Sequence, residues 1–273
     1  MKKILLLIVG LVFSVSSGMT QENSSAVFLQ LGENAPSFTA QSTMGRLNFP
    51  KDYQDDWKII FSHPADFTPV CSSEIIELAS IQNDLKRMNV DILVVSTDHV
   101  ETHTQWVKSL ESLEYKNRKT EKINFPLVDD NDRSIAKKYG MIQPNVHSTR
   151  DVRGVFIIDP QNKIRAMFYY PMNIGRNTNE IIRTVQALQT ADKYKILTPA
   201  NWQTGEEVLV PYIKYADAPA DLAKQEDPDA KWNTGDEILV PYLEYTNNEA
   251  DRIYPAGPDI RMVSWYMWLK NMK

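Results

Sequence analysis

The chain has 273 residues, 42% of them hydrophobic, which is enough to bury a substantial core, and its composition excludes a disordered or fibrous protein. Its formal net charge of −5, without a basic cluster, argues against nucleic acid as a partner. The single cysteine, Cys71, cannot form an internal disulfide.

The first eighteen residues have the plan of a secretory signal peptide. Two lysines precede an apolar run from Ile4 to Val15, and the small residues Ser16 and Gly18 suit a cleavage site. The run is shorter than the about 20 residues that cross a membrane, and no later stretch approaches that length. We therefore expect an exported protein, periplasmic or extracellular, without stable membrane insertion once residues 1–18 are removed. Because exported proteins usually pair their cysteines, a lone thiol there needs a chemical reason.

Short β-branched runs alternate with stretches of helical periodicity through the next part of the chain. Strands are expected at residues 58–62, 91–96, 154–158 and 164–169. A helix is expected to begin close to Cys71 and to reach Met88, because apolar residues recur there at three- and four-residue steps. Further helices are expected at 102–113, 134–139 and 178–188. This alternation predicts an α/β sheet in a domain of residues 26–190.

Residues 191–273 are expected to form a small C-terminal extension that contains β structure and an internal repeat. Residues 202–215 read WQTGEEVLVPYIKY, and residues 232–245 read WNTGDEILVPYLEY. Each copy offers a Thr-Gly turn and a short apolar strand stopped by a proline. Because so small a unit buries little surface by itself, we expect it to pack on the main domain or on a second subunit.

The stretch FSHPADFTPVCSSE, residues 61–74, carries the most chemical information. Thr68 and Pro69 read as the N-cap and first residue of the helix, which puts Cys71 in its first turn. Unpaired N–H groups and the helix dipole stabilise a thiolate there. A nearby cation is needed as well, and an arginine at a strand start, such as Arg153, could donate hydrogen bonds to sulfur and substrate while remaining charged. Composition alone does not select it from the other arginines.

Pro64, Thr68 and Cys71 match the Pro-x-x-x-Thr-x-x-Cys motif of the peroxiredoxins, and the surrounding stretch resembles their one-cysteine branch. The similarity covers nearly all of residues 29–200, including LGENAPSFTA, INFPLVDD, VRGVFIIDP and YPMNIGRNTNEIIR. It implies a thioredoxin-like fold and a thiol-dependent peroxidase that reduces hydrogen peroxide and organic hydroperoxides in antioxidant defence. It implies neither a cofactor nor a metal. It also implies that the C-terminal extension makes contacts in a homodimer or larger homo-oligomer.

The resemblance also implies residue roles. Cys71 would be the peroxidatic nucleophile, Thr68 would hydrogen-bond the thiolate and the peroxide, Pro64 would shield the pocket from water, and Arg153 would polarise sulfur and substrate. Because the chain has no second cysteine, the resulting sulfenic acid would need an external thiol or a thioredoxin-like protein as reductant.

Three further residues receive supporting roles from the same resemblance. Glu74 and Arg176 would orient the arginine at position 153, and His63 could hydrogen-bond an oxidised or substrate-bound cysteine. One family feature is missing: where some members carry a lipase-like Gly-x-Ser-x-Gly element, residues 54–58 read QDDWK, so phospholipase activity is not expected.

Several alternatives stay open on the sequence alone. The principal one is a non-catalytic, thioredoxin-like oligomeric binding or holdase protein. A thiol hydrolase is remote, because His63 has no evident group to orient it. His99 and His103 are spaced to hold a metal, but a solvated helix start is the expected reading. Glu74 could also merely face solvent, as most charged helix residues do.

Overall fold

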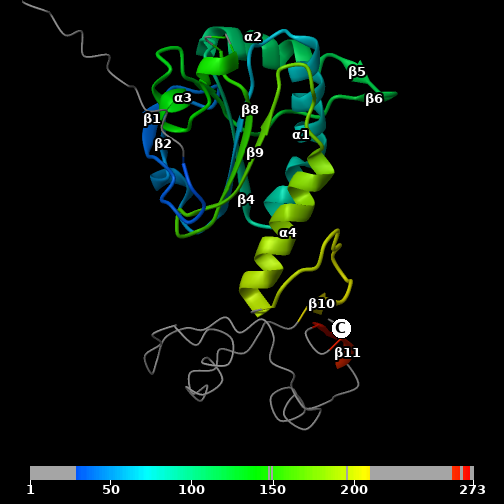
Figure 1. Ribbon diagram of the computed structural model, residues 1–273. Coiled ribbons are helices and arrows are strands. Elements are labelled where there is room, and N and C mark those ends of the chain that lie inside the picture. The colour runs from blue at the N-terminus through cyan, green and yellow to red at the C-terminus, as the bar shows by residue number, and fades with distance from the viewer. Residues whose placement is uncertain are drawn as a thin grey trace, which may run out of the picture.

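The computed structural model describes residues 29–146, 148, 150–194, 196–209, 260–264 and 267–270. Its centre is a five-stranded mixed sheet with the strand order β7-β4-β3-β8-β9 (Figure 1). The strands are β3 (Trp57–Ser62), β4 (Val90–Ser96), β7 (Leu127–Asp129), β8 (Arg153–Ile158) and β9 (Ile164–Tyr170). β3, β4 and β7 are parallel, whereas β8 pairs antiparallel with β3 and β9.

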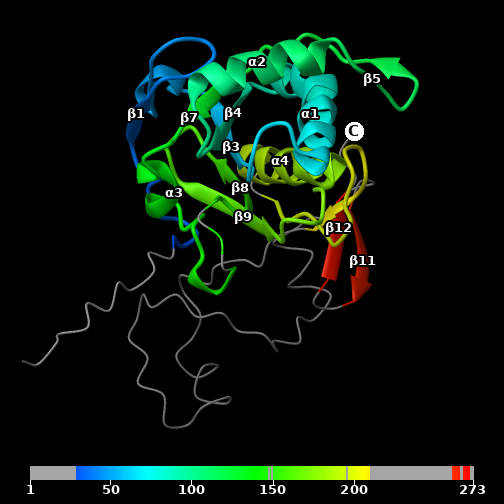
Figure 2. The ribbon, with the colours of Figure 1, turned by 90° about the horizontal axis from the view of Figure 1, so that it is seen from above.

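Other elements cover both faces of this sheet (Figure 2). One face carries the helices α1 (Pro69–Arg87), α2 (Val100–Glu111) and α4 (Thr178–Tyr194). The other carries the hairpin of β1 (Phe38–Ala40) and β2 (Leu47–Phe49) together with α3 (Ser134–Lys138). The smaller elements are the 3-10 turns η1 (Lys51–Tyr53) and η2 (Pro144–Val146) and the hairpin of β5 (Glu114–Tyr115) and β6 (Arg118–Lys119).

The core has two parts because successive residues of a strand point to opposite faces of the sheet. In β3, the fully buried Ile59 and Phe61 pack under α1, α2 and α4, whereas Ile60 packs against β2 and α3. Strands buried on both faces have nearly continuous apolar sequences. This explains why these segments read as β-branched runs without a polar alternation.

The four strands expected from the sequence are confirmed to within one residue at each end. α1 begins at Pro69, as predicted, and α2 begins two residues earlier than expected. α4 runs on to Tyr194, so the domain boundary expected at residue 190 falls inside a helix. Sequence patterns did not predict β1, β2 and β7, since three residues are too few to show a period.

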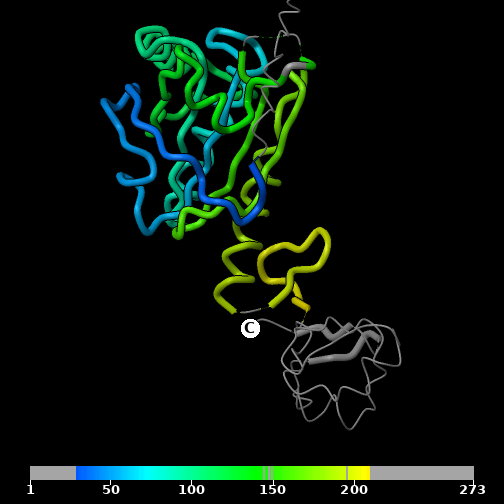
Figure 3. Tube along the Cα trace, turned by 60° about the vertical axis from the view of Figure 1, so that its left-hand side comes forward, coloured from blue at the N-terminus to red at the C-terminus, as the bar shows by residue number. Residues whose placement is uncertain are grey.

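The described part of the first copy of the repeat, residues 202–209, packs beside the C-terminal half of α4, where it is drawn in yellow in Figure 3. Trp202 is only 2% exposed and lies in a small core with Ala187, Ile196 and Val208. Gly205 has a φ of +97°, a left-handed conformation that favours glycine at this turn. Residues 202–209 therefore pack on the main domain, one of the two arrangements that the sequence predicts for the unit.

The strand of that copy, β10 (Val208–Leu209), pairs with β12 (Met267–Lys270), which in turn pairs with β11 (Ile260–Ser264). The second copy, residues 232–245, and the expected signal peptide, residues 1–18, lie outside the described residues. Among the helices that are described, none has the length and apolar character required to cross a bilayer.

Candidate active site

Cys71 lies in the first turn of α1, as the sequence predicts, and its side chain is fully buried. Thr68 is the N-cap residue, with an extended backbone (φ −109°, ψ 148°), and Pro69 is the first helical residue. The first helical hydrogen bond runs from the Ser72 N–H to the Thr68 carbonyl oxygen at 2.9 Å. The N–H groups ahead of it have no partner within the helix, and with the helix dipole they favour an anion at this end.

The Thr68 side chain does not make the capping hydrogen bond expected from the sequence. Its hydroxyl instead donates to the carbonyl oxygen of Ala65 at 2.8 Å. A hydroxyl has one proton and two lone pairs, so this bond uses the proton and leaves the oxygen as an acceptor. Thr68 therefore offers a hydrogen-bond acceptor beside the first turn of α1.

Among the arginines that the structure describes, Arg153 is the one whose side chain contacts the cysteine. It begins β8, and its Nη1 lies 3.2 Å from Cys71 Sγ and 2.7 Å from Glu74 Oε2. On its other side, Nε and Nη2 donate to the Met172 carbonyl oxygen at 2.9 and 2.5 Å. The guanidinium is thus fixed from both sides, with one N–H directed at the sulfur.

Glu74 lies one helical turn after Cys71 and is 3% exposed, so the reading that it merely faces solvent is wrong. Its two oxygens accept hydrogen bonds at 2.8 and 2.7 Å from Nε and Nη2 of Arg176, and the Arg176 backbone N–H adds a third at 2.8 Å. Burial raises the pKa of Glu74, but the hydrogen bonds and charge of Arg176, together with the charge of Arg153, lower it further, to below its ordinary value. Glu74 is therefore a carboxylate bound by two arginines.

The cluster carries an excess positive charge as long as the cysteine is neutral. Arg153 and Arg176 contribute two buried guanidinium groups, and Glu74 contributes one carboxylate. Buried charges are costly unless they are paired. A thiolate at Cys71, 3.2 Å from Arg153, neutralises the remaining charge. The electrostatics of the cluster therefore favour an ionised sulfur.

The segment before α1 is also held in place. Pro64 is buried, and its carbonyl oxygen accepts a hydrogen bond from Arg150 Nη1 at 3.1 Å. Phe67 has a φ of +54°, in the left-handed region that non-glycine residues seldom adopt, as the chain turns into the helix. Strained backbone of this kind clusters at functional sites.

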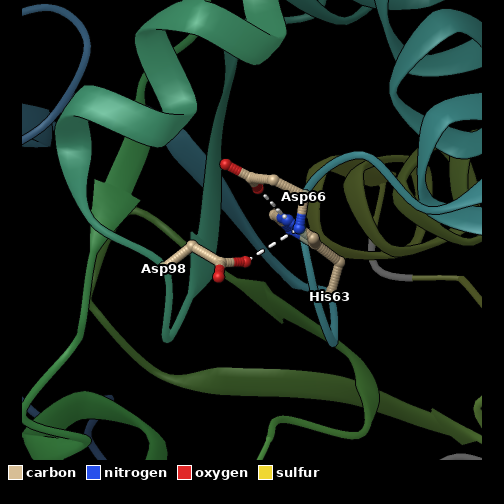
Figure 4. Close-up of side chains that lie close together, drawn as sticks. All are labelled: His63, Asp66 and Asp98. Carbon is tan, nitrogen blue, oxygen red and sulfur yellow. Dashed lines mark hydrogen bonds and ion pairs between the residues drawn. The ribbon is translucent and has the colours of Figure 1, made fainter.

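Sequence reasoning missed two residues beside His63, namely Asp66 and His103. Asp66 accepts hydrogen bonds from His63 Nε2 at 2.8 Å and from His103 Nδ1 at 2.7 Å, and its backbone N–H donates to Asp98 (Figure 4). The expectation that nothing orients His63 is therefore wrong. The expectation of a solvated helix start is wrong for His103, which is fully buried.

A helical stripe in the sequence could have revealed the burial of His103. His103, Trp106 and Leu110 stand at positions i, i+3 and i+7, and all three are buried on one face of α2. Asp66 gave no comparable signal, because its contact with His103 joins residues 37 positions apart.

Among the described residues, two groups of side chains lie close enough together to hold a metal ion, and neither contains both His99 and His103. In the group of His63, Asp66 and Asp98, His63 Nε2 is bonded to Asp66, and the Asp98 oxygens bind the Asp66 N–H and Arg150. His99 groups with Glu101 and Asp129 at an exposed position, away from the buried His103. The spaced pair of histidines therefore does not form a metal site.

Replacing Glu74 by glutamine should destabilise the folded protein at neutral pH, by about 3 kcal/mol, because it removes one partner of a buried ion pair. The folded-state pKa of Glu74 lies below the ordinary value of 4.5. Its ionisation thus adds stability above that value, and this contribution is lost as the pH falls through the folded pKa. Urea denaturation should be measured from neutral pH to pH values below 4.5. The difference in the free energy of unfolding between wild type and Glu74→Gln should become smaller as the pH falls.

The exposed pair of Asp84 and Arg87, which also lies in α1, provides the matched control. Asp84→Asn should change the free energy of unfolding by less than about 1 kcal/mol, because exposed ion pairs contribute little. A gap between wild type and Glu74→Gln that stays constant from neutral pH into acid would contradict the assignment of Glu74 as a charged partner of the arginines.

Comparisons with known proteins agree with this geometry. Residues 31–167 match the AhpC/TSA family, and residues 187–222 match the C-terminal domain of 1-Cys peroxiredoxin. The chain is 50% identical over 182 residues to a peroxiredoxin of Methanosarcina mazei, covering 66% of this chain and 83% of the relative. It is 41% identical over 192 residues to a 1-Cys peroxiredoxin of Dictyostelium discoideum, covering 70% and 78%.

Solved structures give the same result. A yeast mitochondrial 1-Cys peroxiredoxin matches with a TM-score of 0.68 and 30% identity, over 90% of this chain and all of that one. Peroxiredoxin 6 of Arenicola marina matches with a TM-score of 0.65 and 28% identity, over 89% of this chain and 98% of that one. The thioredoxin-like fold is thereby confirmed, and the non-catalytic alternative is not favoured. The chain belongs to the peroxiredoxins, in their one-cysteine branch, and is a thiol-dependent peroxidase.

Proposed function

We propose that the Cys71 thiolate attacks the terminal oxygen of a hydroperoxide in line with the O–O bond. An S–O bond forms as the O–O bond breaks, and the leaving oxygen takes a proton and departs as water or an alcohol. Cys71, oxidised by two electrons, becomes a sulfenic acid. The observation that carries this proposal is the 3.2 Å contact between Arg153 Nη1 and Cys71 Sγ in the first turn of a helix.

Arg153 has two tasks in this reaction. Its charge stabilises the thiolate, and its N–H groups can stabilise the negative charge that develops on the departing oxygen. Glu74 and the Met172 carbonyl oxygen hold the guanidinium in place, so little reorganisation is needed during the reaction. Arg176 acts through Glu74, since it binds both oxygens of that carboxylate.

Thr68 receives the peroxide as a hydrogen-bond acceptor. Its hydroxyl proton is committed to the Ala65 carbonyl oxygen, so its lone pairs are directed to a donor such as the O–H of a hydroperoxide. The buried Pro64 lies in the same segment and keeps water from this side of the sulfur. Together these residues would bind and orient the substrate while Arg153 polarises it.

The sulfenic acid must be reduced by a thiol from outside the chain, because Cys71 is the only cysteine. In the yeast mitochondrial 1-Cys peroxiredoxin, the thiol is resolved through glutathione and thioredoxin systems. This similarity supports a small thiol or a thioredoxin-like protein as the reductant here. Without it, further peroxide would carry Cys71 on to a sulfinic acid.

Rapid mixing of the reduced protein with hydrogen peroxide tests the reaction. Stopped-flow tryptophan fluorescence should show fast, stoichiometric oxidation with a trappable sulfenic acid at Cys71, and Cys71→Ser should abolish it. Arg153→Met should slow the reaction by about a hundredfold, the usual cost of removing one such donor. Arg153→Lys keeps the charge but loses the planar guanidinium group, and its oxidation rate should lie between those of the wild type and Arg153→Met. Oxidation at the rate of an ordinary free thiol would overturn the proposal.

Substitution of Thr68 separates its two possible roles. Thr68→Ser keeps the hydroxyl and should retain most of the oxidation rate. Thr68→Val keeps the shape but removes the hydroxyl, and should slow oxidation by about a hundredfold. It also loses the hydrogen bond to the Ala65 carbonyl oxygen, so the free energy of unfolding should fall by about 1 kcal/mol. Equal rates for the two variants would show that the hydroxyl has no part in the reaction.

We also propose that the protein is exported and acts as a homodimer or larger homo-oligomer. The signal-like residues 1–18 support the first statement. The second is supported by the match of residues 187–222 to the C-terminal domain of 1-Cys peroxiredoxin, an extension that the resemblance associates with contacts between subunits. Fractionation of cells that produce the full chain should find it outside the cytoplasm with its N-terminus shortened, and sedimentation should give more than the monomer mass. An intact N-terminus in the cytoplasm would refute the first statement, and a monomer would refute the second.

A further inference from the structure

The backbone at Arg153 forms a tight turn at the point where β8 begins. The carbonyl oxygen of Val152 accepts a hydrogen bond from the N–H of Gly154 at 3.0 Å, which closes a three-residue γ-turn with Arg153 at its centre. On one side, Arg153 is paired with Tyr170 of β9. On the other side, the pairing of β8 with β3 ends at Val155, before it reaches the turn.

Ser62, the last residue of β3, links this turn to the neighbouring strand by its side chain. Its hydroxyl donates to the Val152 carbonyl oxygen at 2.6 Å and accepts from the Gly154 N–H at 2.8 Å. A hydroxyl has one proton and two lone pairs, so it can make both bonds at once. Ser62 is fully buried, so water cannot replace a bond that is lost here. The hydroxyl thus binds both ends of the γ-turn.

Glycine at position 154 leaves room for this hydroxyl between the two strands. A Cβ there would lie 3.1 Å from Ser62 Oγ and 3.0 Å from Cε2 of Phe156. Arg176 binds the same junction, because its Nη1 donates to the carbonyl oxygens of Ser62 and Gly154 at 2.8 and 2.7 Å. The Ser62 hydroxyl therefore lies where both arginines of the active site meet the backbone.

The γ-turn sets the direction in which the Arg153 side chain leaves the backbone. The guanidinium stands at the end of a long side chain, so a small rotation at the Cα moves Nη1 by a larger distance. Glu74 and the Met172 carbonyl oxygen hold the guanidinium itself, 3.2 Å from Cys71 Sγ. A misplacement of about 1 Å in an active site can cost about a hundredfold in rate. The start of the side chain must therefore be held as firmly as its end.

We infer that Ser62 is a positioning residue of the peroxidase, whose hydroxyl holds the γ-turn at Arg153 and so keeps Nη1 within hydrogen-bond distance of Cys71 Sγ. Both bonds of the hydroxyl go to backbone groups next to Arg153, so Ser62 acts on the sulfur through that guanidinium. This inference rests on the proposed function, because it assigns Ser62 to the site at which Cys71 reacts.

The substitution Ser62→Ala removes the hydroxyl and leaves the rest of the side chain in place. Stopped-flow oxidation of Cys71 by hydrogen peroxide should slow about tenfold, less than in Arg153→Met, because the guanidinium remains but is less well placed. In the Arg153→Met background, Ser62→Ala should cause no further slowing, since the hydroxyl acts through that guanidinium. The effect of a merely structural contact would not depend on the residue at position 153.

Ser42 provides the matched control, because its buried hydroxyl makes the same two kinds of bond at a turn between β1 and β2. It donates to the Gly45 carbonyl oxygen at 2.7 Å and accepts from the Met44 N–H at 3.1 Å. Ser42→Ala should lower the urea midpoint about as much as Ser62→Ala and leave the oxidation rate unchanged.

A second variant reaches the same contact from the other strand. Gly154→Ala places a methyl group against Ser62 Oγ, and it should also slow oxidation in the wild type but not in the Arg153→Met background. The inference can therefore be tested even if Ser62→Ala does not fold.

Two results would overturn the inference. One is a wild-type oxidation rate in folded Ser62→Ala or Gly154→Ala. The other is an equal slowing by Ser62→Ala in the wild-type and Arg153→Met backgrounds. Oxidation of the wild type at the rate of an ordinary free thiol would instead refute the proposed function, and it would be seen before any variant is made.

Discussion

The active site depends on one carboxylate held between two arginines. Glu74 projects from α1 one turn after Cys71, and it receives Arg153 from the start of β8 and Arg176 from the loop before α4. The same bonds therefore join a helix, a strand and a loop, and place a guanidinium nitrogen 3.2 Å from the sulfur. A buried carboxylate with one arginine would satisfy its own charge. A carboxylate paired with two arginines leaves one positive charge, which a thiolate at Cys71 would neutralise.

The sheet explains how such distant segments meet. β3 and β8 are antiparallel neighbours, so the C-terminal end of β3 and the N-terminal end of β8 lie side by side at the same end of the sheet. Ser62, which ends β3, binds both the Val152 carbonyl oxygen and the Gly154 N–H through its hydroxyl. A Cβ at Gly154 would come within 3.1 Å of that hydroxyl oxygen, so glycine allows the close approach. These contacts of Ser62, at this end of the sheet, fix the backbone on both sides of Arg153.

The sequence predicts those parts of the site that rest on local structure. The Thr-Pro pair places Cys71 in the first turn of α1, and the β-branched run after Arg153 places that residue at a strand start. The long-range partners could not be chosen in the same way. Nothing local distinguishes Arg153 from other arginines without the resemblance, and nothing local pairs Asp66 with His103. The cap of Thr68 failed for a related reason, because its hydroxyl donates to the carbonyl oxygen of Ala65 and no helix N–H donates to it.

The two buried carboxylates are Glu74 in α1 and Asp66 in the segment before it, and they differ in what their partners can do. Arginine keeps its charge at any physiological pH, so Glu74 supports a permanent field around the sulfur. Histidine can exchange its charge for a lone pair. Burial lowers the pKa of His63, so the charged form of this ring is disfavoured although it is bound to the Asp66 carboxylate. The arginine pair thus holds a permanent positive charge beside the sulfur, whereas Asp66 binds Nε2 of His63 and leaves Nδ1 of that ring without a partner among the described residues.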